Sequence, residues 1–323
     1  MPECVEYDYI DKSEEGVIVE EQELRKLGEQ EFIEQYRKTE KDRYEKPSIT
    51  TDMAIFTVAT DTVQDRRKKA AKELQLLLIR RGGHPYKGDW ALAGGFMGID
   101  EDLDTAVRRE LKEETGVEGI YAEQLYTWSA VDRDPRMRIV SVSYLALVDQ
   151  SRLPSLQAGD DAEEVAWFTV RDTVLDTHDE VLGGTARRTE QIRLELTSGE
   201  TVVRAGLERV TVTQGTNTQT SVTITERDGL AFDHAEIILY SLERLRGKVN
   251  YTNIAFNLVA EEFTLPDLQQ VYEVILGRPL NKVQFRRYAE EMVLDTGKEV
   301  TTGAYRPSKL YRYNPAWVPD RWK

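Results

Sequence analysis

The stretch from residue 95 to residue 117, GFMGIDEDLDTAVRRELKEETGV, decides the fold of this chain. Its apolar residues recur at the spacing of a helix, about 100° per residue, which predicts a helix over about Leu103–Thr115. Glu110 and Glu114 stand at i,i+4 and fall inside the apolar stripe, and Glu113 lies beside them. The stripe itself is made of Leu103, Ala106, Val107 and Leu111.

The acids on this stripe predict a bound cation. A glutamate-rich helix is usually a solvated face with salt bridges, but the neighbours of Glu110 and Glu114 three and four positions away include no lysine or arginine. Like charges at this spacing cost roughly 0.2–0.5 kcal/mol even when exposed, and burying them unpaired costs more. We therefore expect a divalent ion there, and oxygen ligands favour Mg²⁺ or Mn²⁺.

The fixed residues of this stretch resemble the Nudix box at every defined position. The resemblance implies an α/β/α sandwich built on a mixed sheet, and runs of strands with few helices indicate the same α+β class. The expected strands are Met53–Val58, Leu74–Ile79, Tyr121–Trp128, Ile139–Val148 and Val165–Thr169. The matching pattern is Gly95-x5-Glu101-x7-Arg109-Glu110-Leu111-x-Glu113-Glu114-x-Gly116-Val117.

The resemblance to the Nudix family also implies roles at the site. The metal would be held by three carboxylates and by the backbone carbonyl near Gly95, with Arg109 and Glu101 as orienting groups paired with each other. The metal would neutralise diphosphate oxygens and lower the pKa of a bound water. The three metal-binding and catalytic carboxylates are Glu110, Glu113 and Glu114. Loop candidates for the general base, with an exposed acidic turn as the alternative, are Asp160, Asp161, Glu163 and Glu164.

Two arginines suggest a phosphorylated substrate. Arg133 and Arg136 lie in a loop expected beside the metal site, where they suit diphosphate contacts, although a charged turn with local Asp–Arg pairs is the alternative. With residues 231–237 and 242–248, this loop looks like the ADP-ribose pyrophosphatase branch of the Nudix family, and like the Nudix-related regulators of NAD metabolism. The first expectation is Mg²⁺-dependent cleavage of a nucleoside diphosphate sugar, ADP-ribose to AMP and ribose 5-phosphate. The alternative is a DNA-binding regulator that senses ADP-ribose or NAD. Because those regulators often have eroded boxes, the three retained glutamates favour catalysis.

The C-terminal part has the pattern of a winged helix-turn-helix domain. We expect two helices followed by a hairpin. The first helix runs over Leu265–Leu276, and the hairpin over Val300–Tyr313. Asn281 caps the second helix, whose apolar stripe is Phe285, Tyr288, Ala289 and Met292. This part carries excess positive charge, so DNA is a candidate partner, whereas dimerisation or shielding of substrate would need no such charge. The candidate DNA-binding residues are Lys282, Arg286, Arg287, Arg306 and Lys309.

Three segments are expected along the chain. They are a charged helical extension (1–48), a Nudix domain (49–250) with a β-rich insertion at about 178–228, and the winged helix domain (251–323). Helices at 11–46 suit packing or dimerisation, so we expect a homodimer. A strong amphipathic helix is expected over Asp233–Leu245.

Composition excludes several classes of protein. The net charge of −15 argues against nonspecific nucleic-acid binding by the whole molecule. The negative charge is concentrated in residues 1–240, because residues 241–323 have 13 Lys and Arg against 10 Asp and Glu. One cysteine excludes an internal disulfide, and the absence of a signal peptide or a long apolar run leads us to expect a cytoplasmic protein without membrane partners. The scattered His84, His178 and His234 support no histidine metal site, and His234 is expected at a helix start or in packing.

Overall fold

The computed structural model describes residues 27–39, 45–60, 72–153, 162–301 and 307–318. The chain divides into two compact units, Met1–Pro47 and Ser48–Lys323. The described part of the first unit is the helix α2, Glu29–Thr39, in which the rings of Phe32 and Tyr36 pack at i,i+4 with centroids 5.7 Å apart. This helix falls within the helical stretch expected at 11–46.

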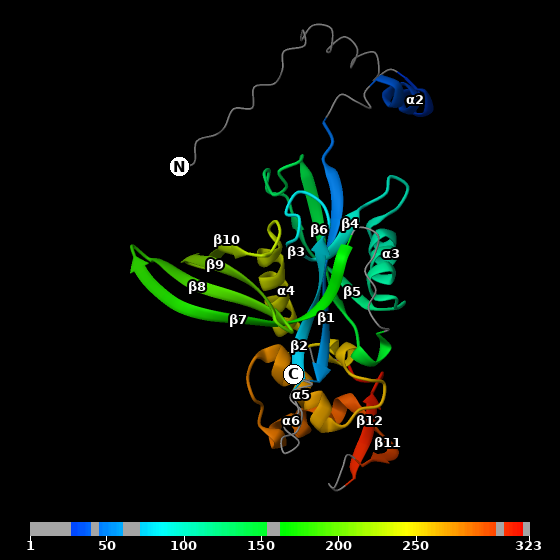
Figure 1. Cartoon of the computed structure of the whole chain (residues 1–323), viewed down its shortest axis with the longest axis vertical. Helices are drawn as coiled ribbons and strands as arrows, with labels where there is room; N and C mark the ends of the chain where they lie inside the picture. Colours follow the sequence, from blue (N-terminus) through cyan, green and yellow to red (C-terminus); the bar gives the residue numbers. More distant parts are fainter. Residues whose placement is uncertain (1–26, 40–44, 61–71, 154–161, 302–306, 319–323) are drawn as a thin grey trace. The chain divides into compact units, whose positions relative to one another are not determined.

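The unit from Ser48 is built on one mixed sheet of ten strands (Figure 1). The main path runs β10-β9-β8-β7-β2-β1-β6-β5, with β3 on β2 and β4 on β1, and only the pair β1–β6 is parallel among the described pairings. The mixed sheet confirms the predicted α+β class. Its strands are β1 Ser48–Thr60, β2 Lys72–Arg81, β3 Trp90–Ala91, β4 Ala93–Phe96, β5 Tyr121–Trp128, β6 Ile139–Leu147, β7 Ala162–Leu182, β8 Thr185–Ser198, β9 Thr201–Gln214 and β10 Asn217–Asp228.

A helix covers each face of the central strands. Successive side chains of a strand point to opposite faces. Met53 and Ile55 of β1 accordingly pack in the core beneath α3, Leu103–Thr115, while Ala54 and Phe56 pack in the core beneath α4, His234–Lys248. Figure 1 shows α3 and α4 on opposite sides of these strands. The chain therefore has the three layers of an α/β/α sandwich.

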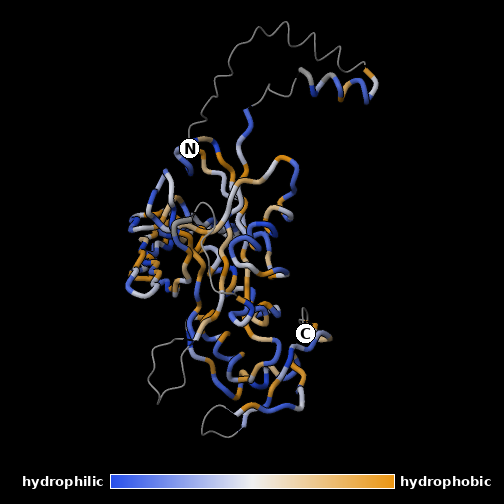
Figure 2. The backbone as a smooth tube through the Cα atoms, turned by 45° about the vertical axis from the view of Figure 1, so that its right-hand side comes forward, coloured by the Kyte–Doolittle hydropathy of each residue, from blue (hydrophilic) through white to orange (hydrophobic). Residues whose placement is uncertain are grey.

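The strand β7 carries the sheet beyond the sandwich. Its first residues pair with β2 up to Thr169, and from there to Leu182 it pairs with β8, so the β-rich segment continues the same sheet. Two-residue turns join β7 to β10 in order, and glycines with positive φ occupy them, as hairpin turns of this length require (Gly183, Gly184, Gly199 and Gly215). Figure 2 shows hydrophobic and hydrophilic stretches interspersed along the backbone.

The C-terminal helices begin and end as their sequences predict. Thr264 and Asp267 form a capping box at the start of α5, Leu265–Leu276, and Gly277 ends this helix at φ 65°. The Asn281 side chain accepts hydrogen bonds from two backbone N–H groups at the start of α6, Lys282–Ala289. The 3-10 turns are η1 Gln150–Arg152, η2 Ile254–Leu258 and η3 Glu290–Met292.

The wing differs from its predicted extent. Its first strand, β11, runs over Val293–Val300 and pairs with β12, Ser308–Tyr313, so the hairpin begins earlier than Val300. Tyr311 of β12 also exchanges two backbone hydrogen bonds with Phe263, at 2.8 and 2.9 Å. Phe285, Ala289 and Met292 are buried as predicted, but Tyr288 is 42% exposed. Within the described residues, none of the helices combines the length and apolar character that spanning a bilayer requires.

Candidate functional site

The helix of the Nudix box, α3, spans the predicted residues. Asp102 caps its start by accepting the backbone N–H of Thr105 at 2.8 Å, and Gly116 ends it at φ 68°, a conformation that favours glycine. Ala106, Val107 and Leu111 are buried, and Glu110 lies on the same face at 8% exposure. The local sequence thus places a carboxylate at the edge of the core.

Glu101 and Arg109 are paired, as the Nudix resemblance implies. The Arg109 guanidinium donates to both Glu101 carboxylate oxygens, with Nη2 at 2.8 Å from Oε1 and Nε at 3.3 Å from Oε2. Glu101 also accepts the backbone N–H of Gly98 at 2.7 Å. These hydrogen bonds lower the pKa of Glu101, so it stays ionised and ties the loop after β4 to α3.

Arg109 also contacts the acids of its own helix. Its Nη1 donates to Glu110 Oε1 at 2.8 Å and to Glu113 Oε2 at 3.2 Å. The expectation that no cation offsets the inward acids is therefore wrong for Glu110. Residues i and i+1 do not face each other on a helix, but an arginine side chain is long and carries five donors, so it folds back over both carboxylates.

Glu114 is the acid of the box that no cation offsets. It is partly buried, and in the described part of the chain no hydrogen bond or ion pair reaches its carboxylate. Burial raises its pKa to about 7, and the charges of Glu110 and Glu113 add to the rise. Burial also raises the pKa of Glu110, but Arg109 opposes that shift. At neutral pH Glu114 is the carboxylate that would gain most from a cation.

The backbone of Gly95 lies against Glu110. A Cβ at Gly95 would stand 2.5 Å from Glu110 Oε1, so a larger residue there would make the Glu110 carboxylate shift. Glu110, Glu114 and the Gly95 carbonyl are hard oxygen donors, which fit Mg²⁺ or Mn²⁺. Among the described residues, however, no three Asp, Glu, His or Cys side chains converge as a ready metal site. Arg109 donates to Oε1 of Glu110, and within the described residues Oε2 accepts no hydrogen bond, so a divalent ion could bind Glu110 beside Arg109.

Arg133 lies away from the box, on the other face of the sheet. Its side chain is 6% exposed, and its guanidinium donates to Asp233 at 2.8 Å and to Asp52 at 3.2 Å. Asp52 shares the α4-facing side of β1 with Ala54, because the two are separated by one residue. Arg133 is thus engaged beneath α4, and the structure does not bring it to Glu110.

Arg136 stands closer to the box. It donates to Asp134 through Nη2 at 2.8 Å, and its guanidinium carbon lies 5.9 Å from the centroid of the Phe96 ring, one residue after Gly95. The side chain of Arg136 is 41% exposed, and Phe96 is 50% exposed. Of the two loop arginines, Arg136 is the one that packs beside the box, and it keeps one local acidic partner as the alternative interpretation allowed.

The loop candidates for a general base are mostly outside the described part. Asp160 and Asp161 lie outside the described residues, and so does the side chain of Glu163. Glu164 is exposed and stands 3.7 Å from Arg80 in an ion pair.

A buried cluster under α4 was missed by sequence reasoning. His234 is buried at the start of α4, as expected, and its Nδ1 accepts the backbone N–H of Leu92 at 2.9 Å, while Nε2 lies 3.6 Å from Asp52. Burial lowers the pKa of His234, so the ring is neutral. Asp52 also accepts from Ser141 at 2.5 Å. These partners come from distant strands, so no spacing in the sequence indicates the cluster.

The candidate DNA-binding residues divide into free and paired cations. Lys282, Arg286 and Arg287 on α6 are exposed, and within the described residues none of them has an ion-pair partner. Lys309 on the wing is paired with Asp295 at 2.7 Å. Arg306 lies outside the described residues.

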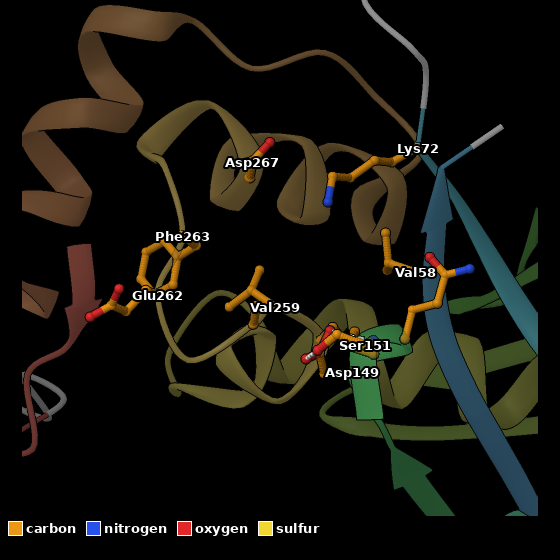
Figure 3. Close-up of a pocket in the computed structure, with 11 residues that line it drawn as sticks. Val58, Lys72, Asp149, Ser151, Val259, Glu262, Phe263 and Asp267 are labelled. Atoms are coloured by element: carbon orange, nitrogen blue, oxygen red, sulfur yellow. Dashed lines mark hydrogen bonds between the residues drawn. The ribbon is translucent and has the colours of Figure 1, made fainter. Parts of the chain in front are cut away.

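Two hollows open away from the box. One, of about 340 Å³, lies between the far end of β1, the start of β2 and the segment leading into α5, and is lined by Val58, Lys72 and Phe263 among others (Figure 3). Of the acids drawn there, Asp267 is held in the capping box of α5 and Glu262 pairs with Lys298. The other, of about 470 Å³, lies beside Arg286 and Arg287 of α6 and Tyr311 of the wing.

Two family models match the chain. A NUDIX domain matches residues 55–188, which contain the box, and an NrtR DNA-binding winged helix domain matches residues 255–313, which contain α5, α6 and the wing. Among curated proteins, an ADP-ribose pyrophosphatase of Methanocaldococcus jannaschii is 40% identical over 101 residues, which cover 31% of this chain and 58% of that protein. That similarity therefore concerns only part of each chain.

Longer similarities span both domains. An ADPR responsive transcriptional repressor of Acinetobacter baylyi is 30% identical over 289 residues, 88% of each chain. A MutT/nudix family protein from Enterococcus faecalis, a crystal structure, is 30% identical with a TM-score of 0.60 over 95% of this chain and 100% of that one. Shewanella oneidensis NrtR complexed with a 27mer DNA is 30% identical with a TM-score of 0.54, over 83% of this chain and 94% of that one. The chain therefore belongs to the family of Nudix proteins that carry an NrtR-type winged helix domain.

Proposed function

We propose that this chain is a DNA-binding transcriptional regulator whose Nudix domain senses a nucleoside diphosphate sugar of the ADP-ribose class. The observation that carries the proposal is the exposed face of α6, where Lys282, Arg286 and Arg287 have no acidic partner in the described chain. Cations without partners on the second helix of a winged helix suit phosphate and base contacts. The similarity to a relative crystallised with DNA supports the same assignment.

The state of the Nudix box supports sensing. Arg109 pairs with Glu110 and Glu113, so two of the three acids of the box already have a positive partner within the chain. A diphosphate near Gly95 would meet Arg136 beside Phe96, and a guanidinium can bind a phosphate through two parallel hydrogen bonds. The ADPR responsive relative, similar over both domains, suggests the ligand class. Mg²⁺ or Mn²⁺, when bound, would neutralise diphosphate oxygens and activate a water.

Hydrolysis of the same ligand is the second candidate function. Glu110, Glu113 and Glu114 are all present, and Glu114 is partly buried with no partner among the described residues, which favours a site that still takes a cation. The partial similarity to an ADP-ribose pyrophosphatase supports this activity. Sensing and slow hydrolysis are compatible, because both need the ligand beside the same carboxylates.

The test measures both activities on the full chain. DNA binding is followed with fragments upstream of genes of NAD metabolism, with and without ADP-ribose, and turnover is followed with ADP-ribose and Mg²⁺. We expect salt-sensitive binding that ADP-ribose changes, and Arg286→Ala should weaken it. Glu114→Gln should abolish any turnover while leaving DNA binding intact. Failure to bind any upstream fragment, with rapid Glu114-dependent turnover, would replace the regulator by the hydrolase.

Two further expectations remain proposals. We propose that the chain forms a homodimer, which light scattering of the full chain tests. We also propose domain boundaries at residues 48 and 250, which limited proteolysis tests. A dimer suits this family assignment because two winged helices can read two half-sites of one operator.

A further inference from the structure

The outward side of α6 carries an apolar residue among its charges. Val283 is 77% exposed, whereas Phe285 and Ala289 are buried and fix the direction in which the helix faces the core. At about 100° per residue, the side opposite this pair is occupied by Val283 and by Arg287, one turn later. These two residues therefore form a ridge, the Val283–Arg287 ridge, that points straight away from the domain.

We propose that the Val283–Arg287 ridge reads bases in the major groove, Val283 by contact with the 5-methyl group of a thymine and Arg287 by two hydrogen bonds to a guanine. The proposal rests on the proposed DNA-binding function and assigns its sequence specificity. The proposal gives Lys282 and Arg286 a different role from these two residues. They lie together on one flank of α6, where they suit contacts with DNA phosphates.

The chemistry of the major groove fits this pair. Thymine presents a methyl group that apolar side chains recognise, and guanine presents two acceptors that match a guanidinium fork. Arg287 is free for that role, because no carboxylate of the described chain pairs with it. Exposing Val283 to water gains the isolated protein nothing, whereas a methyl contact would remove apolar surface from water.

The geometry of the ridge also predicts a spacing. Residues four apart on a helix are separated by about 6 Å along its axis, and stacked base pairs by about 3.4 Å. The thymine and the guanine should therefore lie about two base pairs apart in the recognition site.

The test selects binding sites from a randomised DNA pool with the full chain and with variants. Val283→Ala should lose the preference for one thymine, and Arg287→Gln the preference for one guanine, each by roughly tenfold in relative affinity. Replacing that thymine by deoxyuridine, which lacks the methyl group, should lower the DNA affinity of the parent protein by a similar factor. The DNA affinity of Val283→Ala should not change. Both side chains are exposed, so the variants should fold.

Matched controls make the same changes elsewhere. Val181→Ala, at a position 79% exposed on β7, and Arg193→Gln, on an exposed position of β8, should leave the selected sequence unchanged. An unaltered preference in Val283→Ala and Arg287→Gln, with selection by the parent protein intact, overturns the ridge assignment but leaves DNA binding standing. A uniform loss of affinity without a change of preference would make them phosphate contacts. If the parent chain enriches no sequence, both this assignment and the proposed function fail.

Discussion

Arg109 contacts three carboxylates at once, those of Glu101, Glu110 and Glu113, and hydrogen bonds to Glu101 and Glu110 raise its pKa. Removing its charge would leave Glu110 at the edge of the core with no cation nearby. A buried charge left without its partner costs stability, and a metal ion can replace the missing positive charge. Arg109 therefore supplies the positive charge beside Glu110 in the metal-free protein, and a bound metal ion could supply it when Arg109 is removed.

The first prediction concerns this role of Arg109. Arg109→Ala should lower the free energy of unfolding of the metal-free protein by about 1–2 kcal/mol, because Arg109 is itself partly exposed. Mg²⁺ should restore part of the loss. Denaturant unfolding with EDTA or with Mg²⁺ measures both. Arg108→Ala is the control, since Arg108 is exposed and, among the described residues, forms its one ion pair with Asp104, at 3.8 Å. Equal stability of the two variants in EDTA would contradict the prediction.

Part of this residue-level picture could be predicted from the sequence. Helical spacing placed Glu110 inward and Arg109 near Glu113, and the Nudix pattern paired Arg109 with Glu101. The contact of Arg109 with Glu110 could not be predicted, because a helical projection describes where Cβ atoms point and not how a long side chain folds back. The burial of Arg133 could not be predicted either, because its partners Asp52 and Asp233 lie 81 and 100 residues away in the sequence.

Among the elements, α3 and α5 have the predicted bounds, whereas α4 runs three residues beyond the predicted Leu245, to Lys248, and the extended sheet was not predicted. Caps and apolar periodicity are local signals, so α3 and α5 begin and end where predicted. The length of β7 is not a local signal. After Thr169 the residues are mostly polar on both faces, and they stay extended because β8 pairs with them as far as Leu182. Strand pairing between distant residues decides such a segment.

Helix α4 carries an acid in its first turn whose pKa is shifted by its surroundings. Glu236 lies in its first turn, partly buried, and no hydrogen bond or ion pair of the described chain reaches it. Burial raises its pKa to about 7, and Asp233 adds to the rise, against Arg227 and Arg133. Between pH 4.5 and about pH 7, the folded protein therefore holds a proton on Glu236 that the unfolded chain has released.

The second prediction follows from the direction of this shift. Between the ordinary pKa of a glutamate, 4.5, and about 7, stability should fall as pH rises, because the folded state binds the extra proton. Glu236→Gln, which cannot ionise, should be more stable than the parent protein at pH 8, by about 1–3 kcal/mol, and similar at pH 4.5. Thermal unfolding against pH measures the difference. Glu226→Gln, at an exposed position of β10, is the control. Parallel pH profiles of the parent and Glu236→Gln would exclude the assignment.

At the scale of the whole unit from Ser48, α4 joins the two functional regions. At its start, His234 accepts the N–H of Leu92, three residues before Gly95 of the Nudix box. Near its end, Arg246 donates to Asp172 of β7 at 2.5 and 2.7 Å and to the carbonyl of Ile275 in α5 at 3.1 Å. The buried cores of the sandwich and of the winged helix are also continuous. Hydrogen bonds and packed side chains thus connect the strands before the Nudix box to the helices of the winged helix domain through α4.

The third prediction tests this route at Arg246. By linkage, ADP-ribose must change the affinity for DNA by the same factor as DNA changes the affinity for ADP-ribose, and typical couplings amount to about 1–3 kcal/mol. Arg246→Lys keeps the charge but cannot reach β7 and α5 together as a planar fork does, so the coupling factor should shrink while each separate affinity stays close to that of the parent. Titrations of DNA with and without ADP-ribose, and the reverse, measure it. Arg204→Lys, whose partner Glu195 lies within the sheet extension, should keep the parent coupling. If Arg246→Lys couples the two ligands as strongly as the parent protein, the signal does not pass through the end of α4.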